Sequence, residues 1–273
     1  VTGGPSINML VDHVRKLSGE GACIFTVKSV WRLLMQIGIT PDYCAMIDPH
    51  PSQAVYTEGS PNGMTWLVAS QCDPSVLDSL ERQKANVTLF HVPIIGADNP
   101  ALTCPDGTLD KTKMLVPGGG GVGSRTVRIA ALMRHMPMHL FGFDCCYQNG
   151  SSADPSRIMN GAVPSHVYRL ARGRDETAPI EMNGRIYLST WAFLTETVDI
   201  MQLCASSLIP QLYIHGPGML ADTIREFMAQ QREAAQKKAA ITPETFIGGG
   251  DVFSLDDAPM LPGKPAFEFE ARA

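Results

Sequence analysis

Apolar residues recur along the chain in two periods, and segments of the two kinds alternate. Short apolar runs of strand length are separated by segments in which apolar residues recur at helical spacing. The strand-like runs are 22–26, 43–47, 64–69, 87–91, 138–143 and 212–214. Such alternation is typical of βαβ units around a parallel sheet. The pattern predicts an α/β fold, Rossmann-like, with a mostly parallel sheet and helices on both faces.

Residues that favour helix ends bound the segments with helical spacing. Asp73 precedes one of them and is expected to cap it, whereas Gly19, Gly38 and Pro137 are expected to stop three others. The predicted helices are 7–17, 30–37, 74–84, a segment through 127–133, 191–207 and 220–239. The predicted loops are 49–63, 92–117 and 145–165.

The pattern changes in the last third of the chain. Asn183 and Gly184 favour a tight turn, which predicts a small β-hairpin insertion with strands at 168–171 and 186–189. The predicted divisions are 1–220, a Rossmann-like nucleotide-binding catalytic domain with the hairpin at about 168–189; 221–245, a C-terminal helix; and 246–273, an extended or disordered tail.

Composition and charge narrow the class of protein. The 273 residues are 44% hydrophobic and 18% charged, with a net charge of −5, so we expect a globular protein without a nucleic-acid-binding face. Seven cysteines without C-x-x-C spacing argue against a disulfide framework and against a four-cysteine zinc site, and they favour reduced thiols in the cytoplasm. We find no apolar run of the roughly 20 residues that a membrane span needs.

Four segments lie where predicted strands end and helices or loops begin: 3–6, 48–50, 118–125 and 144–147. In open α/β sheets, ligands bind beyond the carboxyl ends of the strands, at the point where the strand order reverses. We therefore expect these four segments to form one site.

The first segment is a glycine-containing turn made by Gly3, Gly4, Pro5 and Ser6. Glycine lets the backbone approach a ligand closely, and Ser6 is expected to cap the next helix, whose free N–H groups attract phosphate. A tight strand-to-helix turn is the alternative. Residues 1–2 resemble the end of a strand, so we expect the N-terminus to be trimmed.

The third segment is richer in glycine, and it includes Gly119, Gly120, Gly121, Gly123 and Ser124. Backbone N–H groups in such a loop form a cradle for an anion. The segment formally matches the dinucleotide fingerprint and resembles a P-loop without its lysine. A flexible hinge loop without a binding function is the alternative.

Three further side chains are candidates for chemistry. Asp48 and Asp144 each end a predicted strand, where a carboxylate binds ribose, a metal or a nucleophile, or simply caps a turn. His166 follows a polar loop and titrates near neutral pH. His135 and His139 flank a proline, so we do not expect them to share a helical face as zinc ligands.

The order of these motifs resembles the MptE-like proteins. This family includes archaeal 6-hydroxymethylpterin diphosphokinases and the motility-associated-factor glycosyltransferases that modify bacterial flagellin; nonulosonate-related sialyltransferases carry similar motifs. The resemblance spans about 1–220 and rests on Gly-Gly-Pro-Ser at 3–6, Gly-Ile-Thr-Pro-Asp-Tyr at 38–43 leading to Ile-Asp-Pro at 47–49, Gly-Gly-Gly-Val-Gly at 119–123, and Phe-Gly-Phe-Asp at 141–144 with Tyr147.

The resemblance implies a transferase that uses a nucleotide-activated donor. Residues 47–50 hold one carboxylate where the diphosphokinases carry an acidic element for Mg²⁺ and ATP, which favours the glycosyltransferase branch and a nucleotide-sugar donor, with CMP-nonulosonate as the candidate and no certain cofactor. It also implies that residues 3–6, Asp48 and residues 119–124 bind the nucleotide, that Asp144 orients a sugar or ribose, and that His166 is the general base.

The alternatives differ in ligand. A diphosphokinase would use ATP and Mg²⁺ near Asp48, an oxidoreductase would bind NAD, and a non-catalytic module would only bind the nucleotide. The expected partners are a small nucleotide-type ligand and a protein or glycan acceptor.

Overall fold

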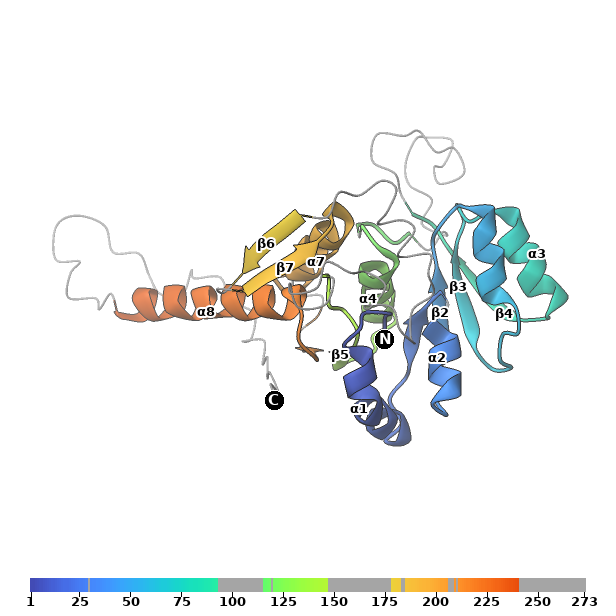
Figure 1. The fold of residues 1–273 in the computed structure, drawn as a ribbon, viewed down its shortest axis with the longest axis horizontal. Helices are drawn as coiled ribbons and strands as arrows, with labels where there is room; N and C mark the ends of the chain where they lie inside the picture. The colour runs from blue at the N-terminus through green and yellow to red at the C-terminus, as the bar shows by residue number, and fades with distance from the viewer. Residues whose placement is uncertain are drawn as a thin grey trace, which may run out of the picture.

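The computed structural model describes residues 1–28, 30–92, 115–118, 120–146, 178–182, 185–205, 209 and 211–240 (Figure 1). Its strands are β1 (Phe25–Val27), β2 (Tyr43–Met46), β3 (Thr65–Ala69), β4 (Asn86–Phe90), β5 (Met138–Leu140), β6 (Ala178–Met182), β7 (Arg185–Ser189) and β8 (Leu212–Ile214). Its helices are α1 (Ile7–Gly19), α2 (Val30–Gln36), the 3₁₀ helix η1 (Pro51–Thr57), α3 (Pro74–Arg82), α4 (Val122–Leu132), α7 (Trp191–Ala205) and α8 (Met219–Ala240).

The strands confirm the predicted parallel α/β fold. β1, β2, β3 and β4 form one parallel sheet in that order, and β5 pairs in parallel with β8. Residues 1–4 lie between the two groups of strands: the backbone nitrogen of Val1 donates to the Phe25 oxygen at 2.7 Å, and that of Thr2 donates to the Phe141 oxygen at 2.8 Å. The segment therefore joins the groups side by side.

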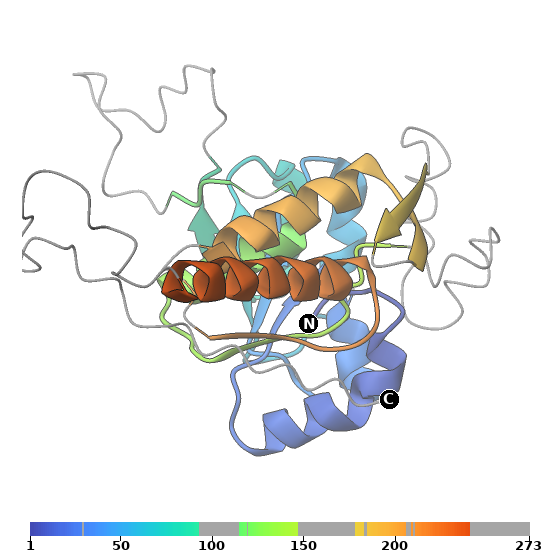
Figure 2. The same cartoon turned by 90° about the vertical axis from the view of Figure 1, so that its left-hand side faces the viewer.

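Helices cover both faces of this arrangement. Figure 1 shows α4 on one side of the β1–β4 sheet and α2 and α3 on the other. α4 packs against β1 and α7, and α7 packs against α8 along the near side of Figure 2. Asp73 caps α3 as predicted, because its side chain accepts a hydrogen bond from the Ser75 nitrogen at 3.0 Å.

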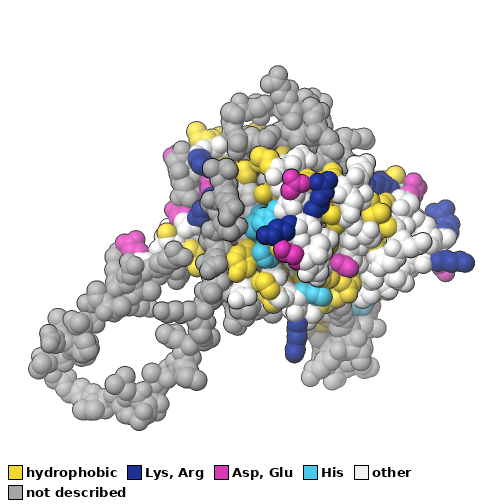
Figure 3. Space-filling model, turned by 90° about the horizontal axis from the view of Figure 1, so that it is seen from below, with side chains coloured by type: hydrophobic (Ala, Val, Ile, Leu, Met, Phe, Trp, Pro, Cys, Tyr) yellow, Lys and Arg dark blue, Asp and Glu magenta, His cyan; other side chains and the backbone are white. Residues whose placement is uncertain are grey.

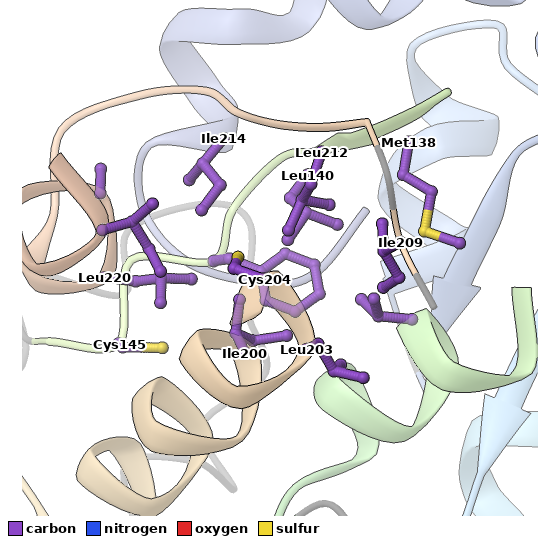
Figure 4. Packing of buried hydrophobic residues seen from close by; sticks show 14 of the residues in the cluster. Met138, Leu140, Cys145, Ile200, Leu203, Cys204, Ile209, Leu212, Ile214 and Leu220 are labelled. Carbon is purple, nitrogen blue, oxygen red and sulfur yellow. The ribbon is translucent and has the colours of Figure 1, made fainter. Parts of the chain in front are cut away.

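A buried apolar cluster joins β5 and β8 to the helices of the second half. Ile200, Leu203 and Cys204 of α7 belong to this cluster together with Leu140 of β5 and Leu212 of β8 (Figure 4). All five of these side chains are at most 6% exposed. This packing holds the segment after β5 in place, and that segment carries Asp144.

Two predicted strands differ from the structure. β5 ends at Leu140 rather than at residue 143, because Gly142 adopts φ 72°, which lies outside the strand region. In the hairpin, β7 pairs with β6 at 178–182 and not with the predicted strand 168–171, which lies outside the described residues. A two-residue turn joins strands that directly flank it, so the partner of β7 has to end just before residue 183.

The hairpin is anchored to α8 by a buried carboxylate. Asp222 of α8 accepts a hydrogen bond from the Tyr187 hydroxyl of β7 and pairs with Arg225 and with Arg185, the latter at 3.4 Å. The carboxylate is 6% exposed. In the part of the chain that the structure describes, no helix is long and apolar enough to cross a membrane.

Candidate functional site

The strand order reverses where residues 1–4 lie between β1 and β5. Thr2 bonds to the backbone after β5, and the Gly4 nitrogen donates to the Gly142 oxygen at 2.9 Å. The chain then turns directly into α1, so the N-terminus of this helix lies beside the end of β5. This is the position at which open α/β sheets bind their ligands.

Asp144 and Ser6 are in direct contact at this point. The Ser6 backbone nitrogen donates to Oδ2 of Asp144 at 2.8 Å, and the Ser6 hydroxyl donates to Oδ1. Ser6 itself has helical dihedral angles and makes no capping hydrogen bond with its side chain, so the prediction that Ser6 caps α1 is wrong. The carboxylate of Asp144 replaces it, because a charged acceptor at a helix N-terminus interacts with both the free N–H group and the helix dipole.

Burial makes the Asp144 carboxyl group a weaker acid than an ordinary aspartate. The residue is 6% exposed, and desolvation raises its pKa to about 6, although the two hydrogen bonds from Ser6 act in the opposite direction. A carboxyl group with this pKa gains and loses a proton near neutral pH.

Two glycines allow the backbone to pack directly against Asp144. A Cβ atom on Gly4 would lie 2.8 Å from Cγ of Asp144, and one on Gly218 would lie 2.8 Å from its Cα. Both distances are too short for a side chain. The turn at residues 3–6 therefore needs Gly4 for close packing, whether or not a ligand also approaches it.

The N-terminus of α4 is engaged by carboxylates from α7. The Ser124 nitrogen donates to Oε1 of Glu196 at 2.9 Å, and the Gly120 nitrogen donates to the carboxylate of Asp199. A Cβ atom on Gly121 would lie 2.8 Å from Glu196, which shows how closely the loop wraps this side chain. The predicted anion cradle thus binds protein carboxylates here.

Glu196 and Asp199 were not found from the sequence. They are 72 and 79 residues from their partners Ser124 and Gly120, so spacing gives no indication of the contact. A signal was present nonetheless, since they are the two charged residues of a largely apolar helix. Burial raises the pKa of Glu196 above its ordinary value, although the positive charge of Lys28 nearby acts in the opposite direction.

Lys28 also pairs with Asp48, with Nζ 3.4 Å from Oδ2. Asp48 in addition accepts a hydrogen bond from the His50 nitrogen at 3.0 Å. This is the contact expected if Asp48 simply caps a turn. Lys28 thus pairs with Asp48 and also acts electrostatically on Glu196. Its part in nucleotide binding stays a prediction.

The remaining predicted residues divide into two groups. Gly3 and Pro5 lie in the first loop, Gly121 precedes α4 and Gly123 lies in its first turn, where a Cβ atom would be 2.9 Å from the Phe143 ring and 3.3 Å from Thr2. Gly119 and His166 lie outside the described residues. The first, third and fourth predicted segments thus lie beside one another as far as the structure describes them.

A cavity of about 650 Å³ lies between β1 and β5. Its walls include Cys23, Ile24 and Met136 toward the amino ends of these strands, and Thr2 and Phe143 toward their carboxyl ends. Open α/β sheets bind ligands beyond the carboxyl ends of their strands, where Asp144 and the glycine loops lie. We therefore place the candidate site at the Asp144 edge.

Two comparisons with known proteins found a match. A family model described as 6-hydroxymethylpterin diphosphokinase MptE-like matches residues 1–150. The solved structure of the MAf glycosyltransferase from Magnetospirillum magneticum AMB-1 is similar with a TM-score of 0.53 and 19% sequence identity, over 80% of this chain and 31% of that chain. This chain thus spans less than a third of that enzyme, and the likeness shows a shared fold. No curated protein sequence matches the chain.

Proposed function

Because this chain belongs to the MptE-like family, we propose that it is a transferase that uses a nucleotide-activated donor, and that the donor is a nucleotide sugar. Three observations support the proposal. The family model covers the first 150 residues, the fold resembles a protein described as a glycosyltransferase, and Ser6 contacts Asp144 where the strand order reverses.

The contact between Asp144 and Ser6 carries the proposal. A buried carboxyl group at this position is suited to accept a hydrogen bond from a ribose or sugar hydroxyl. Asp144 already holds the N-terminus of α1 through Ser6. In the proposed complex, Asp144 orients a hydroxyl of the donor while α1 directs its N-terminus toward the donor phosphate.

The leaving group is assigned to the second loop. In glycosyl transfer, the bond between the anomeric carbon and the phosphate oxygen breaks, the acceptor oxygen bonds to that carbon, and the acceptor's proton passes to a base. Negative charge develops on the phosphate, which the N–H groups of Gly120 and Ser124 would stabilise. Binding there requires the phosphate to replace Glu196 and Asp199 as the acceptors. His166 remains the predicted base, and CMP-nonulosonate remains the predicted donor.

The carboxylates on α7 also favour a second candidate, the pterin diphosphokinase. Mg²⁺ in phosphoryl transfer is bound by one or two carboxylates together with the phosphates. Residues 47–50 hold only Asp48, but Glu196 and Asp199 add two carboxylates beside the glycine loop. They are the residues that would hold Mg²⁺ and bring ATP to the loop.

The variant Glu196→Gln separates the two candidates. Glutamine keeps an oxygen that accepts from Ser124, but it removes the negative charge from the loop. If a nucleotide sugar binds without metal, the loss of repulsion should tighten the binding of CMP or a CMP-sugar by about tenfold. If ATP–Mg²⁺ is the ligand, the loss of a metal-binding carboxylate should weaken its binding by about tenfold or more.

Isothermal titration calorimetry of the full chain with CMP, CMP-sugars, UDP-sugars, ATP–Mg²⁺ and NAD(H) provides the measurement. Glu20→Gln is the matched control, because the Glu20 side chain is 58% exposed and distant from the loop. Tighter CMP binding in Glu196→Gln alone supports the nucleotide-sugar donor. An effect on ATP–Mg²⁺ alone supports the diphosphokinase, and binding of NAD(H) alone would contradict both.

A further inference from the structure

Three histidines meet on the α1 side of the sheet, away from the glycine loops. They are His13 on α1, His139 in β5 and His215 directly after β8. One ring nitrogen from each lies within 4.8 Å of those of the other two, and Nδ1 of His139 lies 2.9 Å from Nε2 of His215. Figure 3 shows histidine side chains in cyan near the middle of the face seen from below.

The group is invisible in the sequence because its members are far apart in the chain. The two members whose ring nitrogens lie 2.9 Å apart, His139 and His215, are 76 residues apart in the sequence. The pair considered from the sequence, His135 and His139, separates in the structure: the ring of His135 lies 5.1 Å from that of Phe25, and the ring of His139 lies 5.1 Å from that of His215.

Aromatic rings pack against two of the three imidazoles. Phe141 stacks on His215 with ring centres 4.4 Å apart, and Tyr213 stacks on His139 at 4.6 Å. These contacts hold the two imidazoles beside each other and beside His13.

We propose that His13, His139 and His215 form a binding site for one divalent transition-metal ion, Zn²⁺. Zn–N bonds of about 2.0–2.1 Å in a tetrahedron place the ligand nitrogens about 3.4 Å apart. The separations here, from 2.9 Å to at most 4.8 Å, bracket that value, so small rotations of the rings bring all three nitrogens to one ion. The group among the described residues consists of imidazoles alone, which favours Zn²⁺ over Mg²⁺ or Ca²⁺.

Access and position fit an ion that binds from solvent. His13 and His139 are partly exposed, while His215 is buried, so the fourth position faces outward for water. The ion links α1 to β5 and to the end of β8. His215 also precedes Gly216, where a Cβ atom would lie 2.9 Å from the Ser6 hydroxyl oxygen. Through His13 and His215, the ion therefore stabilises the position of α1 and of Ser6, which precedes this helix.

The test uses the untagged full chain after treatment with a chelator. Titration with Zn²⁺ should show one ion per chain, and Co²⁺ should give the intense visible absorption of a tetrahedral site. His139→Ala and His215→Ala should each weaken Zn²⁺ binding by at least about tenfold. The controls are His135→Ala and His50→Ala, which should bind as the wild type does.

His13→Gln provides a variant that leaves the sheet intact, since His13 is on α1 and partly exposed. Zn²⁺ should raise the melting temperature of the wild-type chain, and this increase should be lost in His13→Gln. Equal Zn²⁺ affinity in wild type and His13→Gln, or the absence of a tetrahedral Co²⁺ spectrum, overturns the proposal and leaves a hydrogen-bonded group of imidazoles. No nucleotide is present in these assays, so their outcome is independent of the proposed transferase function.

Discussion

Asp144 shows how one residue combines a structural role with chemical potential. Its carboxylate accepts two hydrogen bonds from Ser6, and Gly4 and Gly218 pack directly against it. Burial disfavours its charge, as the pKa of about 6 indicates, yet the group is retained at the switch of strand order. The carboxylate caps α1 through Ser6, and the ligand that we propose would give the same group a second partner.

The raised pKa of Asp144 predicts a specific dependence of stability on pH. In the range between the ordinary pKa of 3.8 and the folded pKa of about 6, the folded chain binds the proton more tightly than the unfolded chain. The free energy of unfolding should therefore fall as the pH rises through this window, by up to about 3 kcal/mol. Asp144→Asn removes this contribution, so the difference between wild type and variant should change between pH 4 and 6.

Urea unfolding at several pH values between 4 and 7.5 provides the measurement. Asp12→Asn is the control, because the Asp12 side chain is 95% exposed. A difference between wild type and Asp144→Asn that is constant over this range, or that changes in the opposite direction, would show that the carboxyl is not destabilised by burial.

At the scale of elements, carboxylates connect helices to their neighbours at two places. Glu196 and Asp199 tie α7 to the N-terminus of α4, and Asp222 ties α8 to the hairpin. In both cases the partner lies far away in the sequence. Helical periodicity predicted α7 and α8 from their apolar positions, but it gives no indication of which polar side chain faces which partner.

Asp222 is expected to stabilise the docking of the hairpin on α8. Asp222→Ala leaves the buried Tyr187 hydroxyl without this acceptor and removes the pairing with two arginines. We expect a loss of about 3 kcal/mol in the free energy of unfolding. Tyr187→Phe removes one hydrogen bond only and should cost about 1 kcal/mol. Urea unfolding of both variants provides the measurement, and a loss from Asp222→Ala no larger than that from Tyr187→Phe would contradict this account.

At the scale of the whole molecule, the sequence predicted the architecture better than the contacts. Apolar runs placed each strand of the parallel sheet within about three residues, since burial on both faces leaves a clear signal. The predicted partner of β7, strand 168–171, was wrong, since β7 pairs with residues 178–182. The turn motif at residues 183–184 marks where the hairpin turns, but the apolar pattern before it did not mark the partner strand. The end of β5 was wrong because the left-handed conformation of Gly142 is not encoded in the apolar pattern.

The candidate site shows the same limit. The sequence brought residues 3–6, Asp48, the glycine loop and Asp144 to one edge, since the topology of parallel strands dictates which ends meet. It did not indicate that Asp144 would cap α1, that Glu196 of α7 would accept a hydrogen bond from Ser124, or that His13 would lie beside His139. Those contacts depend on side-chain packing between elements, which no local pattern records.

The central claim is that the Asp144 edge binds a nucleotide-activated sugar, and calorimetric titration of CMP into wild type and Asp144→Asn tests it most directly. The account predicts one CMP or CMP-sugar bound per wild-type chain, with an affinity reduced by about tenfold in Asp144→Asn, because a charged acceptor is lost from the site. The absence of binding to wild type, or equal affinity in the two proteins, would contradict it.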